Sequence, residues 1–326
     1  MIKYLDRRDK VILTIALNPA VVRTINVEGF QIDQSNEANQ DALSVGDCGI
    51  YSAYIVKLLQ GDPYVMGISG GIGGRYIKNF LDKNKIKTDF LQVDHETKTH
   101  LFIHDSIHDT TTKILSHNNQ LTQRDFINIK HRIYHHIKET ELITLTGDDS
   151  WSAEFIRDLN SMTKNAIRII TAVEGDSFKA CVNERVYASV MDLDNLKALG
   201  FDFPEDIDSF ERIRNFRREH KMKYLVIKGQ YEIIGFAKNK ICKVNYHAKD
   251  SIYPIVKSMI LGGLSIGIKR NYSFETMIKL MGAIANNCSS DEYPFVIRRN
   301  EIDRGMKHSK LYEIYNQRNG YTIEGV

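Results

Sequence analysis

Short runs of β-branched and aliphatic residues alternate with segments of helical periodicity along most of this chain, and that alternation constrains its fold more than any other feature. We expect strands at residues 11–17, 64–68, 101–104, 142–145, 167–171 and 224–227. We expect helices at residues 50–59, 74–84, 123–138, 153–162, 209–219, 258–268 and 273–285. Regular alternation of strand and helix predicts an α/β fold with a mostly parallel, doubly wound sheet covered by helices on both faces. The continuous apolar strands support this prediction, because the strands of such a sheet are buried on both sides.

Two segments depart from the alternation and point to a smaller second sheet. Residues 22–43 and 88–116 have strand-like patterns of alternating polarity. We expect them to form a β-sheet lid over a cleft at the strand ends. The 326 residues then divide into an α/β body at residues 1–293, which includes the lid, and a C-terminal extension at residues 294–326.

Composition and charge exclude several classes of protein. Hydrophobic residues make up 42% and charged residues 26% of the chain, as in ordinary globular proteins, which excludes disordered, collagen-like and coiled-coil proteins. The net charge of +3 is too small for a protein that binds nucleic acid or membrane surfaces by electrostatics. The apolar run at residues 259–268 is too short to cross a bilayer, and the four cysteines have neither zinc-site nor disulfide spacing. We therefore expect a soluble, cytoplasmic protein with no nucleic-acid partner, no membrane contact and no metal site.

A set of short motifs occurs in a fixed order along the chain. The set comprises Asn18-Pro19-Ala20 with Arg23-Thr24, Gly46-Asp47-Cys48-Gly49, Gly70-Gly71-Ile72-Gly73-Gly74, Glu96-Thr97-Lys98, Leu145-Thr146-Gly147 and Ser258-Met259-Ile260-Leu261-Gly262-Gly263. In order and spacing it resembles the phosphofructokinase-B type family of sugar-phosphate kinases, in particular tagatose-6-phosphate kinase and 1-phosphofructokinase, over residues 11–288. The resemblance implies a ribokinase-like fold, which is a three-layer α/β/α sandwich with a small β-sheet lid. It also implies ATP and Mg²⁺ as cofactors and a sugar phosphate or a nucleotide as the small-molecule ligand.

The same resemblance implies roles for individual residues. On the substrate side it points to Asn18, Arg23, Gly46, Gly49 and Lys98. On the nucleotide side it points to Lys228, Gly229 and Asn286.

The sugar side departs from the family pattern at three positions. Val22 stands where the family has a carboxylate against the sugar hydroxyls, Cys48 replaces a lysine, and Tyr51 replaces an asparagine. The carboxylate of Asp47 would repel a sugar phosphate unless it pointed away. Lys98 replaces the usual arginine, which keeps the charge but loses the bidentate fork.

The catalytic segment departs more strongly. The family has Gly-Ala-Gly-Asp at the start of a late helix, where backbone N–H groups hold the transferring phosphate and the Asp accepts a proton. Here the segment is Pro254-Ile255-Val256-Lys257, in which proline removes an N–H donor and valine is stiff and branched. Lys257 replaces the base with an ammonium that is protonated at neutral pH. It could serve as a phosphate clamp or have no role in the site.

Two other carboxylates are alternative bases. Asp250 is the nearest acidic residue upstream of Lys257, and Asp148 follows an expected strand together with Asp149. The pair at positions 148 and 149 could bind Mg²⁺ or cap the next helix, and the sequence favours capping.

Two clusters outside these motifs have ordinary explanations. His131 and His135 have a metal-compatible spacing but lack a third ligand, so a solvated helix face is expected. The basic run at residues 212–223 could be a phosphate-binding or nucleic-acid-binding patch, but it also fits a solvated helix face, which the pattern favours.

Three hypotheses for function follow. The first is a degenerate sugar-phosphate kinase, impaired in phosphoryl transfer and retained as a metabolite-binding or regulatory protein. The second is an active ATP-dependent hexose-phosphate kinase that uses Asp250 or Asp148 as base and Lys257 as a phosphate clamp. The third is a structural partner that forms a homodimer through the edges of its lid sheet.

Overall fold

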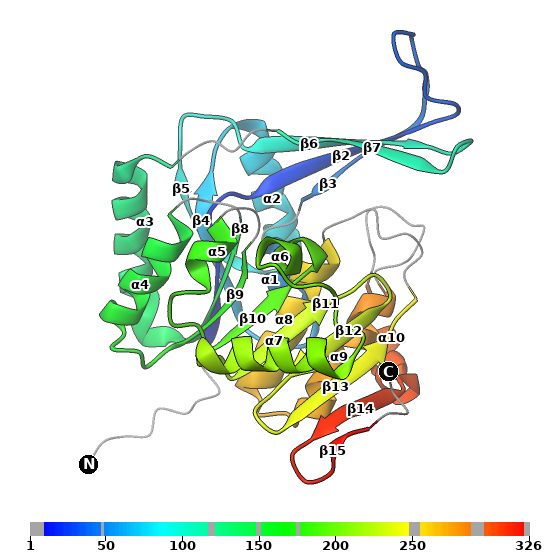
Figure 1. The fold of residues 1–326 in the computed structure, drawn as a ribbon. Coiled ribbons are helices and arrows are strands. Elements are labelled where there is room, and N and C mark those ends of the chain that lie inside the picture. The colour runs from blue at the N-terminus through cyan, green and yellow to red at the C-terminus, as the bar shows by residue number, and fades with distance from the viewer. Residues whose placement is uncertain are drawn as a thin grey trace.

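The computed structural model describes residues 10–46, 49–116, 121–147, 151–173, 177–247, 255–287 and 297–322. Within these residues the chain forms one large mixed sheet, a separate four-stranded sheet and two layers of helices. The expected α/β class is confirmed (Figure 1).

The large sheet has the strand order β15-β14-β13-β12-β11-β10-β9-β8-β1-β4-β5 among the described residues. Its parallel part consists of β1 (Val11–Ala16), β4 (Pro63–Ser69), β5 (Lys87–Gln92), β8 (Thr140–Gly147), β9 (Arg168–Val173), β10 (Ala188–Met191) and β11 (Tyr224–Lys228). Its antiparallel part consists of β12 (Glu232–Phe236), β13 (Lys240–Asn245), β14 (Leu311–Asn316) and β15 (Gly320–Tyr321). The antiparallel strands, two of them near the C-terminus, were not expected from the sequence.

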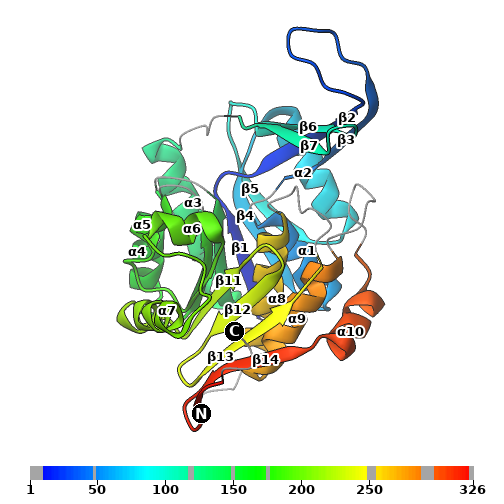
Figure 2. The ribbon, with the colours of Figure 1, turned by 45° about the vertical axis from the view of Figure 1, so that its right-hand side comes forward.

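Helices cover both faces of the large sheet because its strands are apolar on both sides. In β1, Ile12 belongs to the apolar cluster on one face, whereas Leu13 and Ile15 belong to the cluster on the other. The first face is covered by α1 (Ile50–Leu58), α2 (Gly71–Lys83), α8 (Ile255–Lys269), α9 (Phe274–Asn287) and α10 (Arg299–His308). The second face is covered by α3 (Gln123–His136), α4 (Ser152–Met162), α5 (Ser177–Cys181), α6 (Leu193–Ala198) and α7 (Ile207–Glu219). Figure 2 shows the two helix layers with the sheet between them.

Close approach of α1 to α8 depends on a glycine of the sixth motif. A Cβ added at Gly262 would lie 2.5 Å from the carbonyl oxygen of Ser52, so a larger residue would push the two helices apart. The motif therefore has a packing role whether or not the site binds a ligand.

The small sheet has the order β3-β2-β6-β7 and lies above the carboxyl ends of the parallel strands (Figure 1). It consists of β2 (Ala20–Val27), β3 (Ala38–Val45), β6 (Lys98–Asp105) and β7 (Thr110–Ile114). Residues 88–92, which were expected in the lid, instead belong to β5 at the edge of the large sheet. The reason is that Phe90 and Leu91 are buried against the body of the molecule.

Candidate functional site

The residues of the motifs converge at one edge of the large sheet. The parallel strands β1, β4, β8, β9, β10 and β11 all end at this edge, which faces the lid sheet. Ligands of open parallel α/β sheets bind beyond the carboxyl ends of the strands. We call this region the carboxyl-edge site.

Lys257 lies in the first turn of α8, and its side chain is held inside the protein. It is only 3% exposed, and its ammonium forms an ion pair with the Asp192 carboxylate at 2.9 Å. It also donates to Asn195 Oδ1 at 2.6 Å and to the carbonyl oxygen of Val173 at 3.4 Å. Val173 ends β9, Asp192 lies between β10 and α6, and Asn195 lies in the first turn of α6. The structure thus gives Lys257 a buried set of internal partners, and its role as a phosphate clamp stays a prediction.

Asp192 divides its two carboxylate oxygens between two tasks. Oδ1 accepts from the backbone N–H of Asn195 at 3.0 Å and caps α6, while Oδ2 accepts from Lys257. Burial raises the pKa of Asp192, but the charge of Lys257, the Asn195 N–H and the charge of Lys228 outweigh burial and leave the pKa below its ordinary value. Asp192 is therefore an ionised carboxylate between two lysines. The sequence contained a signal for it, since an Asp followed three residues later by Asn is typical of a helix cap after a strand.

The residues around Lys257 in α8 are part of the core. Ile255 and Val256 are buried, and both belong to the apolar cluster beneath the sheet. Pro254 and Asp250 lie outside the described residues. At position 256, then, a side chain that fills the core stands where the family pattern has glycine.

Asn18 follows β1 and keeps an unused donor at the carboxyl edge. Its side chain is 4% exposed, and its Nδ2 group finds no hydrogen-bond acceptor among the described residues. Gly147, at the end of β8, has a φ of 110° and lies against Asn18, since a Cβ added there would be 3.7 Å from the Asn18 backbone nitrogen. A buried donor without an acceptor is costly in a folded protein, so this amide is suited to an oxygen atom of a ligand.

The glycines at positions 46 and 49 fit the loop tightly to the sheet. Gly46 donates its N–H to the carbonyl oxygen of Ala20 at 2.7 Å. Gly49 has a φ of 82°, and a Cβ added there would lie 2.7 Å from Thr146 Oγ1. Asp47 and Cys48, between the two glycines, lie outside the described residues. The local structure therefore explains why glycine occurs at positions 46 and 49.

The other two changed sugar-side positions are buried. Tyr51 packs its ring edge-on against Tyr54 at 6.3 Å and against Phe80 at 5.8 Å. Val22 is buried in β2 of the lid. Both positions thus contribute to apolar packing.

The two lid cations expected on the substrate side, Arg23 and Lys98, are not brought together. Arg23 in β2 is exposed and holds Asp41 of β3 with two hydrogen bonds, which raise the pKa of Arg23 and lower the pKa of Asp41. Lys98 begins β6, where it is opposite Ala20, three positions before Arg23. Because successive residues of a strand point to opposite faces, Arg23 and Lys98 lie on opposite faces of the lid. Burial, together with the charge of Lys98, lowers the pKa of His100 to about 4.

The Gly70–Gly74 and Glu96–Lys98 motifs meet at the start of α2. The carboxylate of Glu96 accepts from the backbone N–H groups of Gly73 at 2.7 Å and Ile72 at 3.0 Å. These hydrogen bonds lower the pKa of Glu96. A Cβ added at Gly71 would lie 1.8 Å from the same carboxylate. An internal carboxylate thus occupies this helix N-terminus, as its positive potential favours.

Most of the residues expected on the nucleotide side form hydrogen bonds next to the antiparallel strands. The hydroxyl of Tyr246 donates to the carbonyl oxygen of Gly229 at 2.8 Å, and Asn286 Oδ1 accepts from the backbone N–H of His247 at 2.7 Å. Lys228 ends β11, and its charge acts on Asp192. Of this group, Lys228 is the one linked to the Lys257–Asp192 pair.

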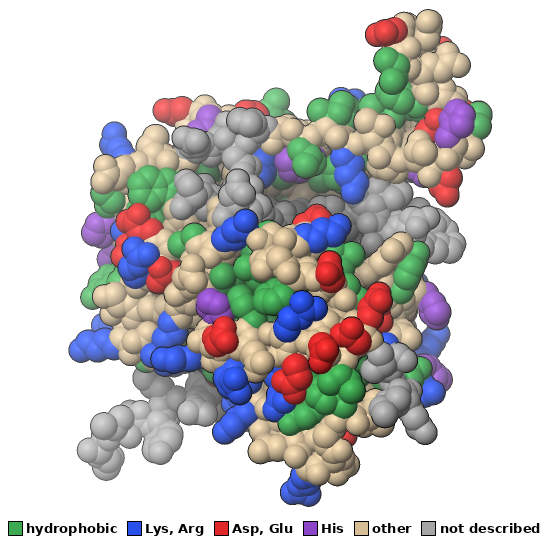
Figure 3. All heavy atoms as spheres, viewed as in Figure 1, with side chains coloured by type: hydrophobic (Ala, Val, Ile, Leu, Met, Phe, Trp, Pro, Cys, Tyr) green, Lys and Arg blue, Asp and Glu red, His purple; other side chains and the backbone are tan. Residues whose placement is uncertain are grey.

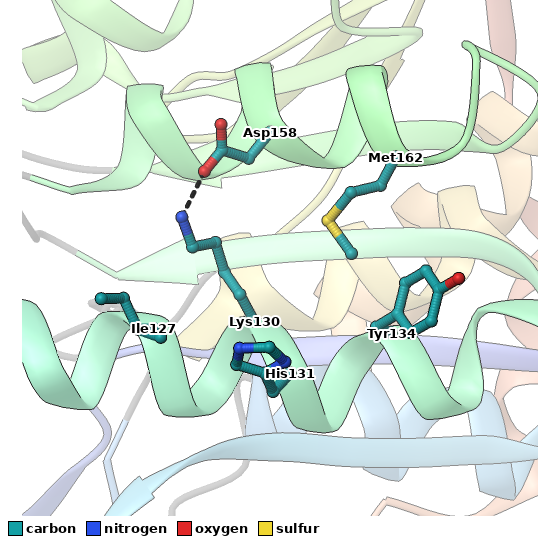
Figure 4. Close-up of a pocket in the computed structure, with 6 residues that line it drawn as sticks. All are labelled: Ile127, Lys130, His131, Tyr134, Asp158 and Met162. Atoms are coloured by element: carbon teal, nitrogen blue, oxygen red, sulfur yellow. Dashed lines mark hydrogen bonds and ion pairs between the residues drawn. The ribbon is translucent and has the colours of Figure 1, made fainter.

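No group of three or more His, Cys, Asp or Glu side chains that could hold a metal ion occurs among the described residues. Asp148 and Asp149 lie outside them. His131 lines a groove of about 470 Å³ between α3 and α4, in which Lys130 reaches across to Asp158 at 2.5 Å (Figure 4). This groove is on the outer face of the helix layer, so it is separate from the carboxyl edge. None of the described helices is long and apolar enough to span a membrane.

Comparison with known proteins gives relatives in both sequence and structure, although no protein-family model matches. Tagatose-6-phosphate kinase of Staphylococcus epidermidis is 21% identical over 314 residues, which cover 93% of this chain and 100% of that protein. 1-Phosphofructokinase of Borreliella burgdorferi is 22% identical over 206 residues, covering 60% of this chain and 65% of that protein.

Solved structures of the same kind share the fold. Phosphofructokinase-2 of Escherichia coli in complex with substrates and products has a TM-score of 0.79 at 14% identity, covering 91% of this chain and 98% of that one. A possible 1-phosphofructokinase of Thermotoga maritima has a TM-score of 0.79 at 19% identity, covering 93% and 99%. The expected ribokinase-like architecture is confirmed by these neighbours.

Proposed function

We propose that this chain is a degenerate member of the phosphofructokinase-B type family of sugar-phosphate kinases, which has lost efficient phosphoryl transfer and still binds a phosphorylated metabolite. One observation carries the proposal. At the position where the family pattern has the general base, the chain has Lys257, whose ammonium is buried in an ion pair with Asp192.

The ion pair bears directly on the chemistry. A general base needs a lone pair within reach of the attacking hydroxyl, and an ammonium has none. The ammonium of Lys257 is instead engaged by the carboxylate of Asp192, 2.9 Å away. Asp192 itself is held by Lys257 and by the start of α6, and its lowered pKa makes it a weak proton acceptor. Phosphoryl transfer depends almost entirely on the positioning and electrostatics of a few groups that act together. Loss of the general base therefore removes the combined effect of these groups, which is not a sum of separate contributions.

Polar and charged residues at the carboxyl-edge site support the proposed binding of a phosphorylated ligand. The buried amide of Asn18 offers a donor that no described residue uses. Lys228 at the end of β11 and Lys98 at the start of β6 keep positive charge at this edge of the molecule. A phosphorylated ligand would complement both features. ATP and Mg²⁺ binding by this chain is part of the proposal, with Lys228 among the residues that the family resemblance assigns to the nucleotide side.

A steady-state kinase assay tests the loss of transfer. The full-length protein is incubated with Mg-ATP and the phosphates of tagatose, fructose and ribose, with an active tagatose-6-phosphate kinase as positive control. We expect no turnover above background. Turnover at ordinary kinase rates, about 1–100 s⁻¹, would overturn the proposal and support an active enzyme with Asp250 or Asp148 as its base.

A melting-temperature screen with the same ligands tests the retained binding. A ligand that binds only the folded state raises the apparent stability, and the rise grows with ligand concentration. We expect a rise for at least one sugar phosphate, and we expect Asn18→Ala to reduce it. Asn26→Ala, which changes an exposed amide in the lid, is the matched control. Flat melting curves with all ligands would contradict binding and favour a scaffold role.

The variant Lys257→Asp tests whether one substitution restores activity. It would remove the ammonium that lies 2.9 Å from Asp192 and add a second carboxylate to the same buried region, so Asp192 would lose its counter-charge and gain a like charge nearby. Pro254 and Val256 would also remain. We expect no recovery of phosphoryl transfer, and recovery in this single variant would refute the assignment.

We further propose that two copies of the chain associate through the lid. Strands β3 and β7 are the edges of the lid sheet, and exposed strand edges favour pairing with another chain. Leu43 and Ile114 on these strands are exposed hydrophobic residues. The proposal predicts a dimer by light scattering that Leu43→Glu with Ile114→Glu converts to a monomer, and a monomeric wild type would refute it.

A further inference from the structure

A groove with a strong positive charge lies at the opposite edge of the large sheet from the carboxyl-edge site. Its volume is about 730 Å³, and it is formed by the end of α7, the start of β11, the turn between β12 and β13, and the start of α9. Seven of its lining residues are basic: Arg214, Arg217, Arg218, Lys221, Lys223, Lys238 and Lys240. We call it the basic groove. Lys and Arg side chains gather below α7 in the space-filling view (Figure 3).

Among the residues that the structure describes, most of this charge is not neutralised. The one acidic residue of the lining, Glu275, pairs with Lys240. Arg214 pairs with Glu211 just outside the groove. The other five basic residues have no carboxylate partner among the described residues: Arg217, Arg218, Lys221, Lys223 and Lys238. A concave surface that concentrates one sign of charge attracts ions of the opposite sign.

The guanidinium of Arg217, in the basic groove, is buried and not solvated. Its side chain is 7% exposed, and Nη1 donates only to backbone carbonyls, to Met222 at 2.5 Å and to Lys223 at 3.4 Å. Its Nε group is buried and has no acceptor among the described residues. Burial, followed by the charges of Arg214 and Arg218, lowers the pKa of Arg217. A buried cation without a counter-charge is destabilising, and a bound anion would remove that cost.

The features of the groove favour a small anion with several charges. A volume of about 730 Å³ lies in the usual range for small-molecule sites. A guanidinium fork matches the geometry of phosphate oxygens, and the surrounding lysines add point charges. The rings of Tyr224 and Phe274 are stacked with centroids 5.8 Å apart and give the groove an aromatic wall. A nucleic acid is a poorer fit, because the net charge of the chain is only +3.

We propose that the basic groove binds an oligophosphate, either free or carried by a nucleoside, at a site separate from the carboxyl edge. Tyr224 starts β11 in the groove, whereas Lys228 ends the same strand at the carboxyl edge. At about 3.3 Å per residue, the two sites are separated by roughly the length of that strand. The inference does not depend on whether the carboxyl-edge site transfers phosphate.

Calorimetric titration of the full-length protein with sodium tripolyphosphate tests the proposal. The variant Arg218→Ala with Lys221→Ala removes two exposed charges of the groove. The matched control, Arg212→Ala with Lys83→Ala, removes two exposed charges elsewhere. We expect binding by the wild type and the control, and at least a tenfold weaker affinity in the groove variant. Absence of binding by the wild type, or equal weakening in both variants, would overturn the proposal.

Two further titrations identify the form of the ligand. Tighter binding of a nucleoside triphosphate than of tripolyphosphate, with the advantage lost in Phe274→Ala, would assign the groove to a nucleotide. Equal binding of the two would assign it to the free oligophosphate. A preference for a single-stranded oligoribonucleotide over both would overturn the proposal of a small ligand.

Discussion

Removing either partner of the Lys257–Asp192 ion pair should destabilise the protein, but by unequal amounts. Two substitutions separate the partners. Asp192→Asn removes the negative charge and keeps the α6 cap, because asparagine caps helices as well as aspartate does. Lys257→Met removes the positive charge and keeps an unbranched apolar chain of similar length in the core.

The expected magnitudes follow from the burial of the two groups. Breaking a buried ion pair costs about 3–5 kcal/mol, because the remaining charge stays buried and unpaired. Asp192→Asn removes the carboxylate partner of Lys257, which is 3% exposed and also donates to the neutral acceptors Asn195 and Val173, so we expect a loss of about 3 kcal/mol. Lys257→Met leaves Asp192, which is 28% exposed and close to Lys228, so we expect a loss of about 1 kcal/mol. The double variant buries no unpaired charge, so we expect it to lose about 1 kcal/mol. The sum of the two single losses is about 4 kcal/mol, so the expected coupling energy is about 3 kcal/mol.

Urea unfolding of the four proteins measures these values. Trp151, the single tryptophan, is stacked on Phe126 with ring centroids 4.7 Å apart, so its fluorescence reports loss of the fold. The free energies of unfolding form a double-mutant cycle. Additive losses, or a greater loss for Lys257→Met than for Asp192→Asn, would refute the assignment of a buried pair with the lysine as its more deeply buried member.

Three further predictions concern groups near the site. Gly49→Ala should lower stability by about 1–3 kcal/mol in urea unfolding, because its Cβ would contact Thr146 and the left-handed backbone strains alanine; an unchanged midpoint would contradict this. The folded-state pKa of His100, about 4, is below the ordinary histidine value of 6.5, so the unfolded state binds its proton first and stability falls as pH drops from about 6.5 to 4. His100→Gln should flatten that decline, by less than about 3 kcal/mol because solvent screens the partly exposed ring, and an unchanged pH profile would refute this. Glu96→Gln should cost about 1 kcal/mol at pH 7, and this cost should shrink as pH falls below about 4.5 and Glu96, whose pKa is lowered by its backbone hydrogen bonds, takes up a proton; a constant difference across pH would argue against the charge.

The parallel part of the fold could be predicted because its strands are apolar on both faces. β1 and β8 are buried at nearly every position, and their composition alone distinguishes them from helices. Strands β12 and β13 were missed because each is short and one face of the pair is partly polar, so neither gives a long apolar run. Residues 88–92 were assigned to the lid for a related reason: an edge strand with alternating polarity has the same pattern in either sheet.

Part of the site could be predicted from the order of the sequence motifs. The replacement at Lys257 could be recognised from the order of the motifs, which is local information. Its partner Asp192 is 65 residues away, and only the parallel packing of β9 and β10 against α8 brings the two together. The same holds for Arg23, whose pairing with Asp41 follows from the β2–β3 register and not from any motif.

The Lys257–Asp192 pair also explains why the proposed loss of transfer would be hard to reverse. An active site of this kind needs a base that is free to accept a proton and positive potential that is free to meet a phosphate. In this chain the carboxylate and the ammonium neutralise each other, so neither is available for its task. Restoring a carboxylate at position 257 would remove the pair's stabilising contribution and set two negative charges together, so stability opposes the reversion. A return to catalysis would therefore require changes at positions 192 and 257 together, and the pair itself acts as a barrier to either change made alone.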